Sequence, residues 1–136
     1  MVVGITEDTE GNIWAERGRP RKLVRIRDFQ VREVFTESQV PPGHNLTADP
    51  RGGIWIETQS GDIVLFRNGV LETKIPLKRE GSPLNRQIIA EADGSILIGY
   101  ENGLVGWRAG KVQAMTTKNG LPCDFVIAFI KDQEKR

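Results

Sequence analysis

The 136-residue chain has very few of the side chains that build disulfides and metal sites. It contains a single cysteine, Cys123, and a single histidine, His44. One cysteine excludes an internal disulfide, and one histidine makes most zinc sites impossible, because such sites need three or four Cys, His or acidic ligands held close together. The sequence therefore argues against metal catalysis, and we predict no cofactor.

An excess of charge of one sign and long apolar runs are also lacking. The 19 basic and 18 acidic side chains leave a formal net charge of +1. A nucleic-acid-binding domain is usually clearly basic, so we predict no nucleic-acid partner. No apolar run approaches the roughly 18 residues of a spanning helix, and the first residues do not read as a secretory signal. We therefore predict that this segment makes no membrane contact.

Turn-forming residues, by contrast, are abundant. Fifteen glycines and seven prolines interrupt the chain. Residues that break helices at this frequency leave no room for long helices and favour many short strands separated by turns. The sequence predicts an all-β fold.

Three segments of the chain resemble one another and repeat in order. Each has an acidic residue, a glycine three residues later and then an aliphatic strand; they are 8–16, 49–57 and 91–99. Their glycines are Gly11, Gly52 and Gly94, and this nearly constant spacing matches the length of one four-stranded propeller blade, about 40–45 residues. A proline turn closes each repeat, at Pro41, Pro83 and Pro122 in turn.

The period predicts a β-propeller fragment of about three four-stranded antiparallel blades over residues 1–136. We place the blades at about 2–43, 44–86 and 87–124, with an extra strand at 125–132. In the second repeat we expect strands at about 45–48, 54–58, 63–67 and 70–75, with turn residues between them. Three blades leave two blade faces bare, so we predict a partner. That partner is either other blades of a parent protein or a second copy, giving a six-bladed homodimer.

These motifs resemble the two-component regulator propeller repeat. The residues that carry the resemblance are Asp8, Gly11, Trp14, Asp49, Gly52, Trp55, Gly61, Gly94, Gly103, Leu104, Trp107, Val126, Asp132 and the run 119–122. Two stretches depart from the pattern: the basic run 17–22 replaces a Gly-Leu hairpin, and the third repeat has Glu91 and Leu97 for Asp and Trp. The resemblance implies a periplasmic or extracytoplasmic sensor half of a hybrid histidine kinase or related regulator. In the best-known members of this family, the propeller senses oligosaccharides or other small ligands and passes the signal through the membrane.

A basic run and one tryptophan are our candidate ligand contacts. Arg17, Arg19 and Arg21 offer bidentate guanidinium contacts to a sulfated or uronic glycan, a phosphate or an acidic partner. The alternative for this run is a solvated hairpin tip with Pro20 at the bend. Trp107 lies in a different strand from the other tryptophans and is freer to stack on a sugar ring.

The remaining repeated residues are assigned to the blade core. Trp14 and Trp55 recur at one repeat position, as blade-to-blade packing requires, although a tryptophan face also suits a sugar. The full set is Trp14, Trp55, Leu97, Phe66, Gly11, Gly52 and Gly94. Asp8 opens a run that resembles part of a calcium loop, but the ligand spacing is wrong. We interpret Asp8 as a cap for backbone N–H groups in a turn.

Two other functions remain open. A self-assembling propeller segment would oligomerise to close a ring. A streptogramin-lyase-like enzyme would share the Gly-aliphatic-Trp strand and would need a catalytic histidine with acidic partners, for which His44 is the sole candidate. With one histidine and no second motif, we assign no catalytic residue and favour a non-enzymatic module that senses a ligand or binds a protein during signal transduction.

Overall fold

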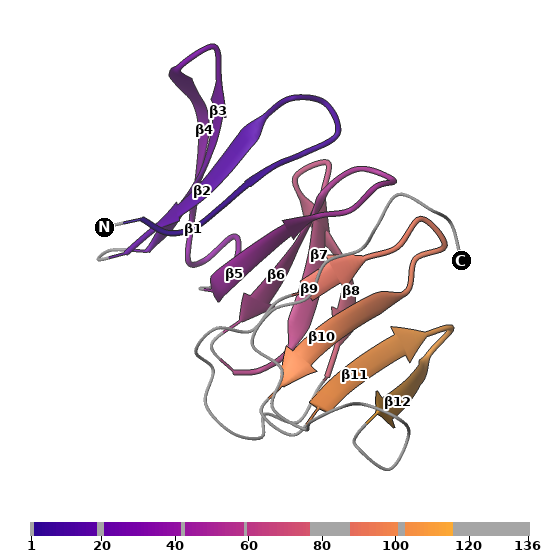
Figure 1. Cartoon of the computed structure of the whole chain (residues 1–136). Coiled ribbons are helices and arrows are strands. Elements are labelled where there is room, and N and C mark those ends of the chain that lie inside the picture. Colours follow the sequence, from indigo (N-terminus) through magenta and orange to yellow (C-terminus); the bar gives the residue numbers. More distant parts are fainter. Residues whose placement is uncertain are drawn as a thin grey trace. The chain divides into compact units, whose positions relative to one another are not determined.

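The computed structural model describes residues 2–18, 21–41, 43–58, 60–76, 88–100 and 103–115. These residues form three four-stranded antiparallel sheets, each built from strands consecutive in sequence, and contain no helix (Figure 1). The predicted all-β propeller fragment with three antiparallel blades is thus confirmed. Within these ranges no helical segment has the length and apolar character that crossing a bilayer demands.

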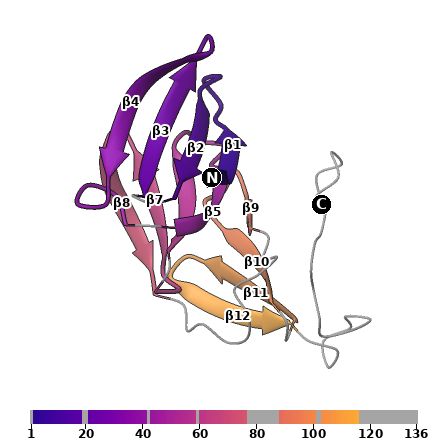
Figure 2. The same ribbon diagram turned by 90° about the vertical axis from the view of Figure 1, so that its left-hand side faces the viewer.

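Each sheet is one blade, and its strands follow the chain order from one edge to the other. The first blade comprises β1 (Val2–Glu7), β2 (Ile13–Arg17), β3 (Lys22–Arg27) and β4 (Gln30–Thr36), which Figure 2 shows side by side. The second comprises β5 (Gly43–Ala48), β6 (Ile54–Thr58), β7 (Ile63–Arg67) and β8 (Val70–Ile75). The third comprises β9 (Ile88–Ala90), β10 (Ile96–Tyr100), β11 (Gly103–Arg108) and β12 (Lys111–Met115).

The strands expected in the second repeat agree closely with the observed ones. β6, β7 and β8 have the predicted bounds, and β5 begins two residues before the predicted start at residue 45. The predicted blade limits 2–43, 44–86 and 87–124 stay predictions. The extra strand predicted at 125–132 and the single cysteine, Cys123, lie outside the described residues.

The chain divides into two compact units, Met1–Arg79 and Glu80–Arg136. In the first unit, the first two blades pack face to face through three aromatic rings. Trp14 and Phe35 stack with ring centroids 6.0 Å apart, and Phe66 of the second blade meets Phe35 edge-on at 5.0 Å and Trp14 at 5.9 Å. Edge-to-face contacts of this kind add to the stabilisation that comes from burying the rings.

Aliphatic side chains from both blades extend this aromatic cluster into the core of the first unit. The cluster of buried residues contains Trp14, Leu23, Val40, Leu46, Ile54, Ile56, Val64 and Phe66, with Phe35 packed against it. At the start of the second blade, Gly43 permits a close approach: a Cβ there would lie 2.7 Å from the carbonyl oxygen of Glu57. A larger residue at position 43 would push β5 away from β6.

The turns that join the first two strands of each blade have the same backbone geometry. In each, the acidic residue accepts a hydrogen bond from the glycine N–H three residues later, at 2.9–3.2 Å. Gly11, Gly52 and Gly94 have φ values of 86°, 101° and 90°. These positive φ values suit glycine, which has no Cβ to clash. The repeated glycines therefore close the turns.

Candidate functional site

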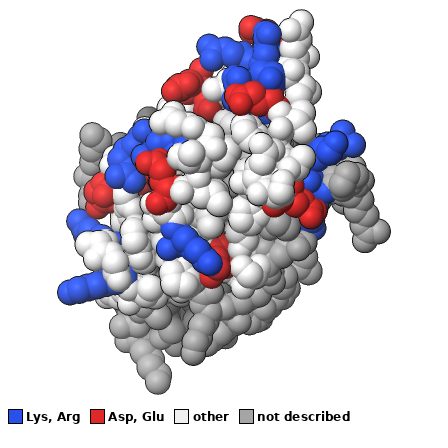
Figure 3. Space-filling view, turned by 180° about the vertical axis from the view of Figure 1, so that it is seen from behind, with Lys and Arg blue, Asp and Glu red and all other residues white. Residues whose placement is uncertain are grey.

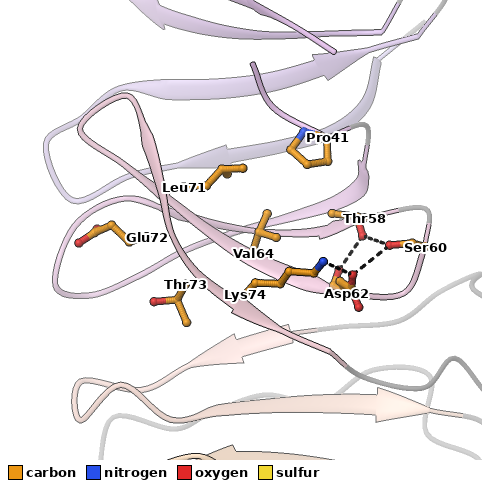
Figure 4. Close-up of a pocket in the computed structure, with 9 residues that line it drawn as sticks. All are labelled: Pro41, Thr58, Ser60, Asp62, Val64, Leu71, Glu72, Thr73 and Lys74. Carbon is orange, nitrogen blue, oxygen red and sulfur yellow. Dashed lines mark hydrogen bonds and ion pairs between the residues drawn. The ribbon is translucent and has the colours of Figure 1, made fainter. Parts of the chain in front are cut away.

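One hollow in the first unit lies on the outer part of the second blade. It has a volume of about 360 Å³. Its lining comes from the end of β6, the β6–β7 turn, β7, β8 and the segment that precedes β5, and consists of Pro41, Thr58, Ser60, Asp62, Val64, Leu71, Glu72, Thr73 and Lys74 (Figure 4). We call this set the outer hollow.

A hydrogen-bonded polar group lines one side of the outer hollow. The Thr58 hydroxyl donates to the Asp62 carbonyl oxygen at 2.9 Å and lies 2.9 Å from the Ser60 hydroxyl oxygen. The Ser60 hydroxyl donates to Asp62 Oδ2 at 3.4 Å, and Lys74 Nζ lies 3.2 Å from the same oxygen (Figure 4). The β6–β7 turn places these groups together, because the Gly61 N–H donates to the Thr58 carbonyl and closes it.

Apolar side chains line the other side of the outer hollow. Val64 is buried, whereas Leu71 is 43% exposed and lies near Pro41 in the view of Figure 4. Together the two sides offer an ammonium donor, hydroxyls that donate or accept, a carboxylate acceptor and a patch of C–H surface. This combination suits a small polar molecule that carries both hydroxyl groups and an apolar face. The described lining residues include no histidine that could act as a general base and no cysteine that could act as a nucleophile.

A second hollow of about 680 Å³ lies where the β1–β2 turn of the first blade faces the β5–β6 turn and β7–β8 tip of the second. Its cations already have partners. Arg25 Nε donates to Glu33 Oε1 at 2.7 Å and its Nη1 to Asn12 Oδ1 at 2.9 Å, while Arg67 Nε donates to the Gly52 carbonyl at 3.0 Å. The aromatic rings at its base are largely buried. These contacts stabilise the interface between the first two blades. The second hollow therefore has fewer side-chain groups available to bind a ligand than the outer hollow has.

The predicted basic run spans the end of β2, the β2–β3 turn and the start of β3, where Arg17 pairs with Lys22 in the sheet register. Arg17 is exposed at the end of β2, and Arg19 lies outside the described residues. Arg21 is engaged within the fold: its Nη1 donates to the Gly43 carbonyl oxygen at 2.6 Å and lies 3.9 Å from Glu16 Oε1. The Gly43 N–H donates to the same Glu16 oxygen at 2.7 Å. Arg21 and Glu16 therefore tie the β2–β3 hairpin to the start of the second blade.

Trp107 lies in β11 of the second unit and is half-buried. It pairs with Ile96 in the sheet register, as Phe66 pairs with Ile54 in the second blade. The position of Phe66 is a blade-packing position, because its ring meets Trp14 and Phe35. Trp107 thus occupies the repeat position of Phe66, which packs the second blade against the first.

A repeated hydrogen bond between aspartate and tryptophan went unforeseen in the sequence analysis. Trp14 Nε1 donates to Asp8 Oδ2 at 2.8 Å, and Trp55 Nε1 donates to Asp49 Oδ2 at 2.7 Å. The signal was available, since both aspartates precede their tryptophans by six residues and the third repeat replaces both partners, with Glu91 and Leu97. The tryptophans are 8% and 1% exposed, so their indoles are engaged inside the first unit.

Asp8 is held ionised by the turn that it caps. Its Oδ1 accepts from the Glu10 and Asn12 backbone N–H groups at 2.9 and 3.0 Å, which confirms its predicted role as a turn cap. Burial alone would raise the pKa of the Asp8 carboxyl, but the hydrogen bonds from Trp14, Asn12 and Glu10 together outweigh it and lower that pKa.

His44, the single candidate for a general base, lies in β5, and its side chain is outside the described part of the structure. The described residues contain no group of three or more His, Cys, Asp or Glu side chains that could hold a metal ion. On the face seen in Figure 3, basic and acidic side chains lie beside each other and not in separate areas. The described residues of that face therefore form no patch of one charge sign for a polyanion.

Comparison with known proteins supports the fold. No family model matches the chain, and no curated protein matches it. Among solved structures it is similar to the extracellular domain of a hybrid two-component system, BT3049, from B. thetaiotaomicron, with a TM-score of 0.64 and 21% sequence identity. The match covers 97% of this chain and 19% of that one, so this chain spans about a fifth of the length of its structural neighbour.

Proposed function

We propose that the chain is a non-enzymatic segment of an extracytoplasmic sensor propeller of the two-component regulator type. The observation that carries the proposal is that nearly the whole chain has the fold of part of an extracellular domain from a hybrid two-component system. The ordered motifs of the repeats, from the Asp-x-x-Gly turn to the proline turn, support the same family. In such a protein the segment serves signal transduction by binding a ligand or another protein.

The outer hollow supports a small neutral ligand with several hydroxyl groups, such as an oligosaccharide unit. Asp62 and Lys74 neutralise each other at 3.2 Å, so neither is a free charge that would demand an ionic ligand. Each ligand hydroxyl would find both an acceptor and a donor there, while Leu71 supplies apolar contact. The ligand-contact roles of Arg17, Arg19, Arg21 and Trp107 stay predictions, and a uronic or sulfated glycan is the ligand that they would favour.

Binding to defined oligosaccharides tests the proposal. The full chain is titrated with neutral oligosaccharides and, separately, with uronic and sulfated ones, while thermal unfolding and calorimetry report binding. A ligand that binds the folded chain raises its Tm in proportion to the logarithm of concentration above Kd. Mass spectrometry of the recovered ligand should show no chemical change. A covalently altered ligand would contradict the non-enzymatic proposal.

Two variants separate the hollow from the basic run. Lys74→Met removes the ammonium group of the outer hollow from a side chain that is 67% exposed, so the fold should tolerate it. Arg17→Ala removes the exposed member of the basic run. We expect Lys74→Met to weaken binding of a neutral oligosaccharide about tenfold or more, as the loss of a hydrogen bond to a charged group would, and Arg17→Ala to leave it unchanged. Lys111→Met, at an exposed position of β12, is the matched control.

A further inference from the structure

One face of the first blade carries an exposed apolar surface. Ile5, Ala15, Val24 and Val34 pair in register and form one row across all four strands, and Ile26 and Val31 pair in the next row. Ile5 is 65% exposed, Val31 58% and Val34 47%, whereas Val24 and Ile26 are half-buried and the small Ala15 is buried. We call these six residues the first-blade apolar face. Contiguous apolar surface of this kind on a soluble protein marks an interaction site.

The same face of the second blade shows what covers such a surface. On its outer strand, Lys74 and Leu71 stand where Val34 and Val31 do, and both are exposed, so the cover lies over the three inner strands. There the corresponding row contains Leu46, Ile56 and Val64, which are 6%, 1% and 4% exposed. These residues are buried in one cluster with Trp14 and Leu23, which project from the opposite face of the first blade. Ile5 and Leu46 thus occupy equivalent positions of successive repeats, one exposed and one buried. The covering blade is the one that precedes in sequence.

The hairpin tip beside the first-blade apolar face has an unusual residue. Asp28 and Phe29 form the two-residue β3–β4 turn with φ values of 54° and 60°, and Phe29 is fully exposed. The equivalent second positions in the β7–β8 and β11–β12 turns are Gly69 and Gly110, with φ values of 79° and 80°. A bulky residue in the left-handed region is strained, and such strain persists where it serves a contact.

The place of Gly69 indicates what Phe29 would contact. Gly69 lines the hollow between the first and second blades, together with residues of the β1–β2 turn of the blade before it. Phe29 holds the same place in the first blade. If a blade covered the first-blade apolar face, the Phe29 ring would project into the seam between that blade and β3–β4, where glycine leaves the observed seam open.

We propose that the first-blade apolar face is the docking surface for one further four-stranded blade, which precedes it in a longer chain, and that Phe29 anchors that blade. The incoming face should carry a tryptophan, a leucine and a phenylalanine in the arrangement of Trp14, Leu23 and Phe35. The apolar character of the face and the complementary packing seen between the first two blades favour a sheet as the occupant over a lipid surface or a small ligand. This inference rests on the proposed propeller segment, but the labelling test below is made without a ligand, so a failure of blade docking and a failure of ligand binding can be told apart.

A fused copy of the first blade provides the test. Residues 1–41 are duplicated ahead of Met1 of the full chain, so that the spacing of the repeated glycines continues into the added blade. Ile5→Cys is placed in the original blade, with Cys123→Ser removing the natural thiol, and the rate of maleimide labelling is measured. We expect the rate to fall at least tenfold in the fusion compared with the 136-residue chain. An unchanged rate would overturn the proposal.

The control carries Trp14→Ser and Phe35→Ser only in the added copy, and it should label at the rate of the 136-residue chain. Equal protection by this control would overturn the requirement for an aromatic face. Two other occupants have their own signatures. Protection of the 136-residue chain that rises with its own concentration would assign the face to a second copy. Protection only on adding phosphatidylcholine–phosphatidylglycerol vesicles would assign it to a lipid surface. Either result would overturn the proposal of a preceding blade.

Phe29→Gly tests the anchor through effects of opposite sign. In the 136-residue chain the substitution should raise Tm by a few degrees, because glycine adopts the required φ without strain. In the fusion it should reduce the increase in Tm that the added blade provides, because the ring contact is lost. An equal rise in Tm in both chains would show that Phe29 makes no contact with the added blade and would overturn its role as anchor.

Discussion

The turn between the first two strands has the same backbone hydrogen bond in all three blades, but its side chains differ. The three turns are β1–β2, β5–β6 and β9–β10. In the first two, an aspartate accepts a hydrogen bond from a tryptophan indole six residues later, whereas the third has Glu91 and Leu97 in these places. Even so, the Gly94 N–H donates to the Glu91 carbonyl at 3.0 Å, as the equivalent glycines do in the other turns. The turn itself therefore depends on glycine and the hairpin, and the Asp–Trp bond is an additional tie between turn and strand.

The two Asp–Trp pairs also differ from each other in burial. Asp49 is fully buried and Trp55 is 1% exposed, whereas Trp14 is 8% exposed and Asp8 is only partly buried. A hydrogen bond in a less solvated place is stronger, and losing one partner there costs more. The second repeat should therefore depend on its pair more than the first does.

Removing the Trp55 side chain should have the largest effect. Trp55→Ala deletes a fully buried indole and leaves Asp49 Oδ2 without its indole donor, so we expect a loss of about 3–5 kcal/mol in the free energy of unfolding. Leu97→Ala, at the equivalent but half-buried position of the third blade, should cost less. Urea unfolding followed by far-ultraviolet circular dichroism measures both. An equal loss of unfolding free energy in Trp55→Ala and Leu97→Ala would contradict the expectation that this repeat position stabilises the fold most where its indole is buried and hydrogen-bonded.

The two aspartates provide the next comparison. Asp49→Ala removes the acceptor for Trp55 Nε1 and for the Arg51 backbone N–H at 2.7 Å, and it removes the carboxylate beside Arg51 and Arg67, although Arg67 keeps Glu72 at 3.2 Å. We expect a cost of about 3 kcal/mol, because the buried indole N–H of Trp55 is left unsatisfied. Asp8→Ala should cost about 1 kcal/mol, since solvent can replace part of what is lost. The same urea measurements decide this, and a larger cost for Asp8 would reverse the ranking.

The blade architecture could be predicted because it depends on features visible along the chain. A glycine that recurs once in each blade marks the turn between the first two strands. The alternation of apolar residues between these turns shows which face of each strand is buried in the core. The strands of the second repeat followed from this with an error of two residues at the start of β5. There Gly43 continues the strand, because its N–H and carbonyl are bound by Glu16 and Arg21 of the preceding blade.

The site was less accessible to sequence reasoning, because its residues come together only through pairing and side-chain direction. The outer hollow joins Pro41 to residues of a turn and of an outer strand, and no motif links them. Arg21 was grouped with Arg17 by sequence proximity, although its guanidinium binds the Gly43 carbonyl 22 residues away. The charge of a run predicts nothing about which of its members already have partners within the fold.

The pH dependence of stability should show how far the first turn depends on its carboxylate. The folded pKa of Asp8 lies below its unfolded value of about 3.9. Its contribution is therefore complete above that unfolded pKa and is lost as the pH falls through the folded pKa. Because Asp8 is largely solvated, the contribution should stay below about 1 kcal/mol.

Asp8→Asn should accordingly reduce the slope of stability against pH between about pH 4 and pH 2. The measurement is the urea midpoint across this range, for the natural chain and the variant. Asp93→Asn is the matched comparison, because hydrogen bonds from Ser95 and the nearby Arg108 also lower the pKa of Asp93, which lies in the third blade's turn. Identical slopes for the natural chain and Asp8→Asn would show that the Asp8 carboxylate is not stabilised by its turn.

Rebuilding the Asp–Trp pair in the third blade should have the smallest effect and gives the sharpest test of the comparison. Leu97→Trp alone places an indole where no aspartate stands, and Glu91→Asp alone shortens an acid that has no indole to accept from. Together they recreate the spacing of the first two repeats. A double-mutant cycle should then give a favourable coupling of about 0.5 kcal/mol, at the low end for contacting residues because position 97 is only half-buried. If the glycine turn positions the two side chains, coupling appears without any other change in the blade. A coupling of zero would mean that the Asp–Trp bond needs more than this turn, and that the burial seen at Asp49 and Trp55 helps to create the bond as well as to strengthen it.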